Sequence, residues 1–184
     1  KYSMKKSALI IFFLVLQCNS ALLWAQTKPE EIKLDTDQFQ ELFYESLLQK
    51  GIENYDKAIV ALDKADKLKP NDAAVYYELG KNYLALKEYK SAYNYFENAT
   101  KIDPKNKWFW IGMYDVSYET KNFTQGIAVI NKLIEFDPKY KEDLTSLYMG
   151  TNQYEKALAL IQELNETIGK TERRELYKSQ ILSE

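Results

Sequence analysis

The chain has 184 residues with a formal net charge of −2, and its 15 tyrosines contribute much of an aromatic content of 14%. Its 6 glycines and 4 prolines are too few for a loop-rich β-sandwich or barrel, and the absence of histidine excludes serine–histidine catalysis and histidine-ligated metal sites. The weakly acidic charge and the single cysteine give no reason to expect a nucleic acid partner, an internal disulfide or a cysteine-rich zinc site.

Residues 1–25 have the pattern of a secretory signal peptide. Lys5 and Lys6 give the segment a positive start, residues 8–16 form an apolar run, and a short stretch containing small residues leads to Ala25. We expect cleavage after Ala25, with a position near Ser20 as the alternative.

The signal peptide pattern also bears on location. A membrane anchor over residues 8–25 is the competing interpretation, but polar residues interrupt this segment and it is short for a span. Residues 1–3 precede the first methionine and are interpreted as an upstream remnant. We therefore expect export to a bacterial periplasm or cell surface, with only transient membrane contact through the signal peptide, and a leader over residues 26–37.

A repeat with a period of about 34 residues runs through most of the remaining chain. Pro70, Pro104 and Pro138 are separated by this step, and each ends a helical pattern because proline cannot continue a helix. Small residues keep the same step, with a slightly shorter one at the end: Ala58, Ala92, Gly126 and Ala157. The period predicts four units, at about residues 38–71, 72–105, 106–139 and 140–168.

Each unit contains two helical patterns. In the second unit, residues 76–83 and residues 92–99 each place apolar and aromatic side chains on one helical face. We expect Gly80 to face Ala92 where the two helices of this pair approach closely, and small residues to do the same later in the chain. The later positions are Gly126 and Ala157.

These spacings resemble the tetratricopeptide repeat, which has the same period. The resemblance covers roughly residues 38–168, and its packing signature is Ala58, Pro70, Gly80, Ala92, Pro104, Gly126, Pro138 and Ala157. It implies an all-α fold, a right-handed α-solenoid of stacked antiparallel helix pairs. The first unit departs from the pattern, because Glu45 and Gln49 stand where apolar residues are expected, so the register of its first helix stays open.

Residues 169–184 contain one more helical pattern. Thr171 is a candidate N-cap, and Leu176, Tyr177 and Ile181 form its apolar positions. Two interpretations remain for this segment: the first helix of an incomplete fifth unit, or a C-terminal cap of the array.

The resemblance implies that the first helix of each pair lines a concave groove that binds a protein or peptide. The residues it places there are Phe43, Leu47, Tyr77, Lys81, Leu84, Trp108, Ile111, Asp115 and Tyr118. The family's best-known groove holds a terminal carboxylate with Lys, Asn and Arg, whereas here the corresponding positions are mostly apolar. We therefore expect a peptide with apolar anchors. For Tyr77, Trp108 and Tyr118, packing within the stack is an equally good interpretation.

The sequence shows no motif for catalysis or for a cofactor. It has no glycine-rich phosphate loop, metal-ligand spacing or nucleophile elbow, so we predict a scaffold without enzymatic activity, cofactor or metal. Two alternatives stay open: a glycan-binding module of the cell envelope that stacks sugars on Trp108 and Tyr118, and the N-terminal repeat part of a longer multidomain protein.

Overall fold

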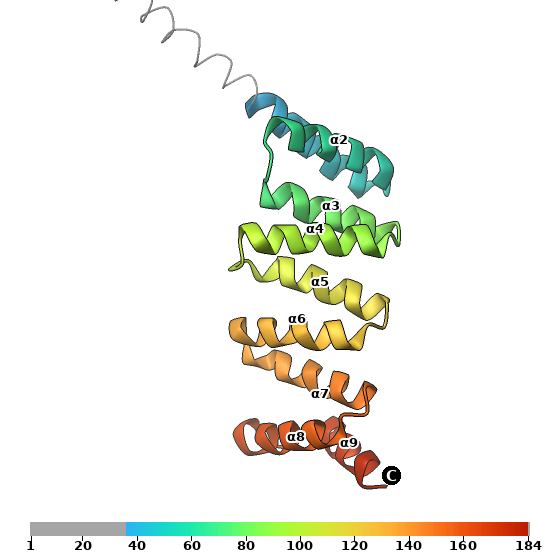
Figure 1. The fold of residues 1–184 in the computed structure, drawn as a ribbon, viewed down its shortest axis with the longest axis vertical. Helices are drawn as coiled ribbons and strands as arrows, with labels where there is room; N and C mark the ends of the chain where they lie inside the picture. Colours follow the sequence, from blue (N-terminus) through green and yellow to red (C-terminus); the bar gives the residue numbers. More distant parts are fainter. Residues whose placement is uncertain (1–35, 184) are drawn as a thin grey trace, which may run out of the picture.

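A computed structural model describes residues 36–183 of the chain (Figure 1). The predicted signal peptide and most of the predicted leader lie outside these residues. The described part is helical and contains no strand. Its first helix covers residues 36–51 and thus includes the last two residues assigned to the leader. The others are α2 (Tyr55–Leu68), α3 (Ala73–Ala85), α4 (Tyr89–Ile102), α5 (Lys107–Glu119), α6 (Phe123–Phe136), the 3-10 turn η1 (Pro138–Tyr140), α7 (Lys141–Gly150), α8 (Tyr154–Ile168) and α9 (Glu172–Leu182).

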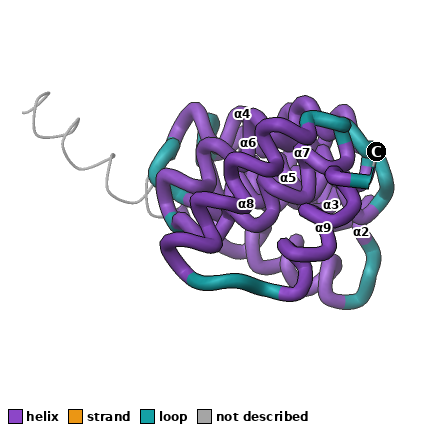
Figure 2. The backbone as a smooth tube through the Cα atoms, turned by 90° about the horizontal axis from the view of Figure 1, so that it is seen from below, coloured by secondary structure: helices purple, strands orange, loops and turns teal. Residues whose placement is uncertain are grey.

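The helices form antiparallel pairs that stack in chain order. Helix 36–51 is followed by α2, α3 pairs with α4, α5 with α6, and α7 with α8, while α9 follows alone (Figure 1). Seen from below, successive helices overlie one another, so the elongated array is a stack (Figure 2). The structure confirms the predicted all-α solenoid of helix pairs.

Side-chain caps begin several of the helices. The Asp72 carboxylate accepts hydrogen bonds from two backbone N–H groups at the start of α3, and Asn106 accepts one at the start of α5. Asn122 caps α6 in the same way, and the predicted N-cap Thr171 accepts from the backbone N–H of Arg174. These caps satisfy N–H groups that the first turn of a helix leaves unpaired.

The turn inside each pair has the same backbone conformation. Its left-handed residue recurs at the step of the repeat, with φ between 54° and 62°: Glu53, Lys87, Lys121 and Asn152. A repeated turn gives each pair the same internal geometry, and this lets the pairs stack in register.

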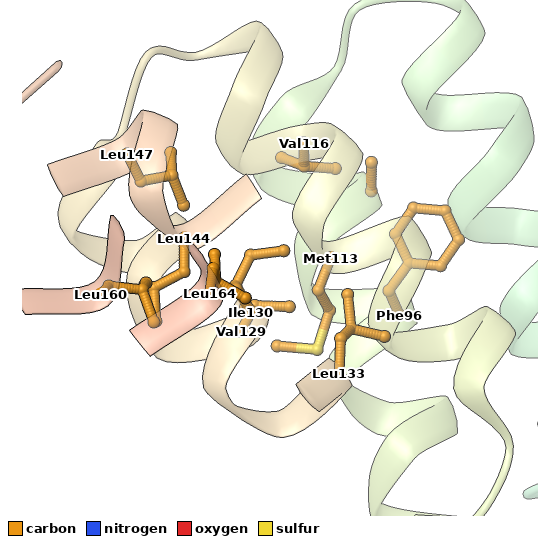
Figure 3. Close-up of a cluster of buried hydrophobic side chains, with 11 residues drawn as sticks. Phe96, Met113, Val116, Val129, Ile130, Leu133, Leu144, Leu147, Leu160 and Leu164 are labelled. Atoms are coloured by element: carbon orange, nitrogen blue, oxygen red, sulfur yellow. The ribbon is translucent and has the colours of Figure 1, made fainter. Parts of the chain in front are cut away.

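Two clusters of buried side chains form the core. One joins α2 to α3 through residues such as Leu62 and Leu79. The other runs from α4 to α8 and contains Phe96, Met113 and Ile130 (Figure 3). Tyr83 packs against both clusters, so the core is continuous along the stack.

Gly80 and Gly126 differ in how closely a neighbouring helix approaches them. A Cβ atom on Gly80 would lie 2.7 Å from the Phe96 ring of α4. Ala92 and Phe96 lie one turn apart on α4, so the larger side chain of this helix reaches the glycine. The nearest atoms to a Cβ on Gly126 belong to Leu147, at an ordinary 3.6 Å.

The last helix, α9, packs through a charged residue. Arg174 is its buried residue, with only 1% of its surface exposed, whereas the expected apolar position Leu176 is exposed. The other two expected apolar positions, Tyr177 and Ile181, are partly buried. Arg174 lies inward because it meets Glu142 of α7 and Asn165 of α8, whose oxygen atoms select a cation.

Candidate functional site

The nine predicted site residues lie on the first helices of three consecutive pairs, helix 36–51, α3 and α5. We call the surface formed by these residues the first-helix face. Trp108 and Tyr118 are its most exposed aromatic side chains, at 55% and 63% of their surface. Asp115 is exposed, and the other six are partly buried. The face thus combines accessible rings with side chains that also belong to the packing of the stack.

Tyr77 belongs mainly to the packing. Its ring centroid lies 5.8 Å from that of Phe96 and 5.2 Å from that of Phe109, both buried. The Lys81 ammonium lies 5.2 Å from the centroid of the Tyr77 ring and covers it. Burial and the charges of Glu78 and Asp115 raise the pKa of Tyr77, so the hydroxyl stays neutral. Tyr77 therefore packs beneath the first-helix face and offers little surface to a partner.

Phe43, Leu47 and Ile111 are likewise partly buried. Phe43 stacks on Phe39 with ring centroids 6.2 Å apart and packs against the core between α2 and α3. Ile111 packs against the second core cluster. The structure therefore spreads the predicted residues along the stack and does not gather all nine at one point.

A charged network that sequence reasoning missed joins the first two pairs. The buried Glu78 carboxylate accepts hydrogen bonds from Lys50 and, at 3.3 Å, from Lys81. Burial and the neighbouring Lys50 ammonium lower the pKa of Lys81. The repeat could have identified Lys50 as a candidate residue. Lys50 stands one repeat step before the predicted site residue Leu84 and occupies the same position in the first unit.

Three predicted residues do meet around one cavity. Leu84, Asp115 and Tyr118 line a space of about 330 Å³ between α3 and α5, together with Ala85, Lys87, Tyr89 and Glu119. Although much of the Asp115 residue is exposed, the side chains around its carboxyl partly desolvate this group. This desolvation and the nearby Glu119 carboxylate raise the pKa of Asp115. The cavity is therefore an aromatic and aliphatic pocket with two carboxylates at its wall, adjacent to exposed side chains of α5.

Trp108 stands at the other end of α5. Its ring lies 5.2 Å from the Lys107 ammonium, and Asn106 caps the helix directly before it. Ten residues separate Trp108 from Tyr118 on one helix, which places them about 15 Å apart along its axis. An extended or helical peptide can span this distance.

Within the described residues 36–183, neither a metal site nor a membrane span is present. No group of three or more carboxylate, cysteine or histidine side chains in this range could hold a metal ion. None of the helices described is long and apolar enough to cross a membrane.

Comparison with known proteins identifies the repeats. Models of the tetratricopeptide repeat match residues 83–147 and residues 46–72. Residues 46–72 and 83–147 are therefore tetratricopeptide repeats. A search of curated proteins finds no match.

Several solved protein structures share the fold. MamA aligns with a TM-score of 0.62 and 15% identity, over 71% of this chain and 73% of MamA. YrrB, described as a TPR protein with an unusual peptide-binding site, aligns with a TM-score of 0.57 and 18% identity, over 69% of this chain and 67% of YrrB. The first TPR domain of Spaghetti (RPAP3), bound to an HSP90 peptide, aligns with a TM-score of 0.57 and 13% identity, over 63% of this chain and 94% of that domain.

Proposed function

We propose that this tetratricopeptide repeat protein binds a peptide segment of a protein partner on its first-helix face and performs no catalysis. The observation that carries the proposal is the cavity between α3 and α5, where Leu84, Asp115 and Tyr118 meet beside exposed aromatic surface. Peptide binding by YrrB and by the Spaghetti domain supports a protein partner. Aromatic side chains at the rim of a preformed pocket are typical anchors of such interfaces.

The stack holds the side chains of the first-helix face in place before a peptide binds. Tyr77 and Lys81 are held by neighbours on α3, α4 and α5, so the floor of the face is ordered before a peptide arrives. A preorganised surface spends less free energy on ordering side chains during binding. We therefore expect the helices to keep their arrangement when the partner binds.

The test uses a peptide selected from a random-peptide phage library on the purified protein and measured by calorimetry. We expect Tyr118→Ala to weaken binding about tenfold, because an exposed aromatic anchor contributes about 1–2 kcal/mol. The control is Phe136→Ala, since Phe136 is an exposed aromatic residue of α6, the second helix of its pair, and lies outside the first-helix face. Equal losses in the two variants, or no loss in Tyr118→Ala, would overturn the assignment of the face.

We further propose that the protein is exported. Support comes from the positive start, apolar run and small residues of residues 1–25. Expression of the full chain in a bacterium, followed by fractionation and mass measurement, tests this. We expect a form that begins at Gln26 in the periplasmic or extracellular fraction. An uncleaved chain in the cytoplasmic fraction would contradict it.

A further inference from the structure

An apolar stripe lies open on the first described helix. Tyr44, Leu48 and Ile52 are spaced four residues apart along residues 36–51 and the turn that follows, so they line one side. Between 63% and 71% of the surface of each is exposed. Single exposed apolar residues are ordinary on a protein surface, but three in a row form a patch that needs an explanation.

The repeat shows which side of the stack this stripe occupies. The counterparts of Tyr44 and Leu48 one unit later are Glu78 and Asn82, which are both buried. Glu78 bonds to Lys50 of the preceding pair, so these counterparts face that pair. Two units later the counterparts are Gly112 and Val116, again buried. Tyr44 and Leu48 therefore lie on the surface that α3 and α5 cover with the pair before them, whereas the counterparts of Ile52, Leu86 and Thr120, are exposed and Ile52 only borders this surface. We call the surface formed by Tyr44, Leu48 and the adjoining Ile52 the end face.

Two carboxylates give the end face a charge. Glu41 and Glu45 stand one repeat step before Val75 and Leu79, which are buried. Both glutamates are exposed, and neither forms an ion pair with a described residue. A surface that covers the end face must therefore be apolar in part and carry positive charge, because like charges in contact are unfavourable.

The opposite end of the stack has these two properties. A cavity of about 610 Å³ between α8 and α9 is lined by the apolar side chains Leu158, Ile161 and Leu182. Lys170 and Lys178 also line it, and neither pairs with a described carboxylate. The remaining lining residues are Ala159, Gln162, Asn165 and Glu166.

We propose that the end face of one copy docks against the α8–α9 cavity of a second copy, head to tail. The apolar stripe covers the apolar floor of the cavity, and Glu41 and Glu45 lie opposite Lys170 and Lys178. A head-to-head contact is disfavoured because it brings the glutamates of two end faces into one interface. Two different patches that meet in this way generate an open chain of copies, and the small contact makes the association concentration-dependent.

The test is sedimentation velocity on the purified protein and two blocked variants over a range of concentrations. Leu48→Glu blocks the end face, and Leu182→Glu blocks the cavity. We expect the unchanged protein to form larger species as its concentration rises, and each variant alone to remain monomeric. A mixture of the two variants should form a one-to-one dimer and nothing larger, because it contains one open end face and one open cavity.

Controls separate this proposal from folding defects and from other occupants. Val60→Glu places the same charge on an exposed apolar position of α2 whose counterparts, Asn94 and Ala128, are also exposed, so it should leave association unchanged. Circular dichroism checks the helix content of every variant.

Four outcomes would overturn the proposal. A monomer at all concentrations would do so, as would dimers of Leu182→Glu alone, which would show a head-to-head contact. A mixture of the two variants without a dimer would also contradict it. Equal effects of Leu48→Glu and Val60→Glu on association would show that the end face has no specific role in it.

Charge exchange gives an independent check. Glu45→Lys should weaken association at low salt, because it places a cation opposite Lys178. Adding Lys178→Glu to the same chain should restore association. The two charges are then exchanged, so the facing side chains again carry opposite charges and attract each other. Failure of the double variant to recover would overturn the assignment of these two groups to one interface.

Discussion

Phe96 is packed between two glycines from different pairs. A Cβ atom on Gly80 of α3 would lie 2.7 Å from its ring, and one on Gly112 of α5 would lie 2.6 Å from it. The ring itself is fully buried, so it has no free space into which it could move. A large side chain on α4 thus replaces the missing side chains of its two neighbours, and any added methyl group at the glycines competes with it.

We predict that Gly112→Ala destabilises the fold by about 1–3 kcal/mol, because the methyl group overpacks the Phe96 ring. Gly126→Ala is the matched control: its Cβ would meet Leu147 at 3.6 Å, an ordinary contact. There we expect no loss, or a gain of up to about 1 kcal/mol from the better helix propensity of alanine. Urea unfolding of the two variants measures the difference, and equal stabilities would contradict the packing assigned to Phe96.

The Asp115 carboxyl is the acidic group of the site with a perturbed ionisation. Burial and the Glu119 carboxylate raise its pKa above the usual value. The charged form therefore lowers the stability of the folded state above the raised pKa, and this cost disappears as the pH falls below the ordinary pKa of aspartate. A cation brought by a bound peptide would offset the same cost.

We predict that Asp115→Asn raises stability at neutral pH and that the gain vanishes in acid. The gain should stay below about 1 kcal/mol, because solvent screens this exposed group. Asp137→Asn should act in the opposite direction, since hydrogen bonds from Lys139 lower the pKa of Asp137 and the charged form stabilises the fold. Thermal unfolding at neutral and acid pH measures both variants, and a gain for Asp115→Asn that persists in acid would contradict the prediction.

At the scale of the element, α9 is held by one buried cation. The Arg174 side chain donates from Nη1 to Asn165 at 2.8 Å and from Nε to Thr171 at 3.1 Å. Its Nε also lies 3.2 Å from a carboxylate oxygen of Glu142 on α7. The guanidinium therefore connects α9 to both helices of the preceding pair, where the apolar contacts of α9 are few.

We predict that Arg174→Met releases α9 from the stack while the other helices keep their structure. Loss of one partner from a buried ion pair leaves the other uncompensated, at a cost of about 3 kcal/mol, which corresponds to roughly 100-fold faster hydrogen exchange in α9. Lys178→Met, which removes an exposed cation of the same helix that forms no ion pair with a described residue, is the control and should leave exchange unchanged. A global loss of stability in place of local release would contradict this assignment.

The helices themselves follow from local rules in the sequence, and their charged contacts do not. The apolar spacing of residues 76–83 and 92–99 lies within single helices, so the sequence alone predicted the helix pairs. The caps Asp72 and Asn106 are also local, because they bond to N–H groups within three residues. The Lys50–Glu78 bond and the inward position of Arg174 depend on groups in neighbouring pairs. A helical period records which side of a helix is apolar, and it carries little information about a buried charge whose partner lies on another helix.

The same limit applies to the candidate site. The resemblance to the tetratricopeptide repeat placed Leu84, Asp115 and Tyr118 on one face, and the structure brings them around one cavity. It did not include Glu119, Lys87 or Tyr89, which enter the cavity from the end of α5, the turn of the second pair and the start of α4. These positions depend on the way α3 packs against α5, which no single unit contains.

At the scale of the whole molecule, the stack has few contacts between distant parts. Each pair packs mainly on its neighbours in chain order, as in other repeat proteins. The stability of such an array is the sum of the stabilities of its units and of the interfaces between them. Weakening an interface in the middle of the stack should therefore separate the unfolding of its two halves, whereas weakening one at the end should release only that end.

Phe96 stands at the interface between the second and third pairs, where it contacts Gly80, Gly112 and Tyr77. We predict that Phe96→Ala costs about 3–5 kcal/mol and divides unfolding into two transitions, because the two halves of the stack lose their main connection. Leu164→Ala on α8, also buried, removes packing near the C-terminal end and should shift only the release of that end.

Urea unfolding followed by circular dichroism, with hydrogen exchange on both halves, distinguishes the two variants. In Phe96→Ala we expect α2 and α3 to lose protection at a different urea concentration from α6 to α8, because each half then unfolds with its own stability. In Leu164→Ala we expect the α2–α5 region to keep the protection of the unchanged protein. A single coincident transition in Phe96→Ala would show that the halves are joined chiefly by contacts other than this ring.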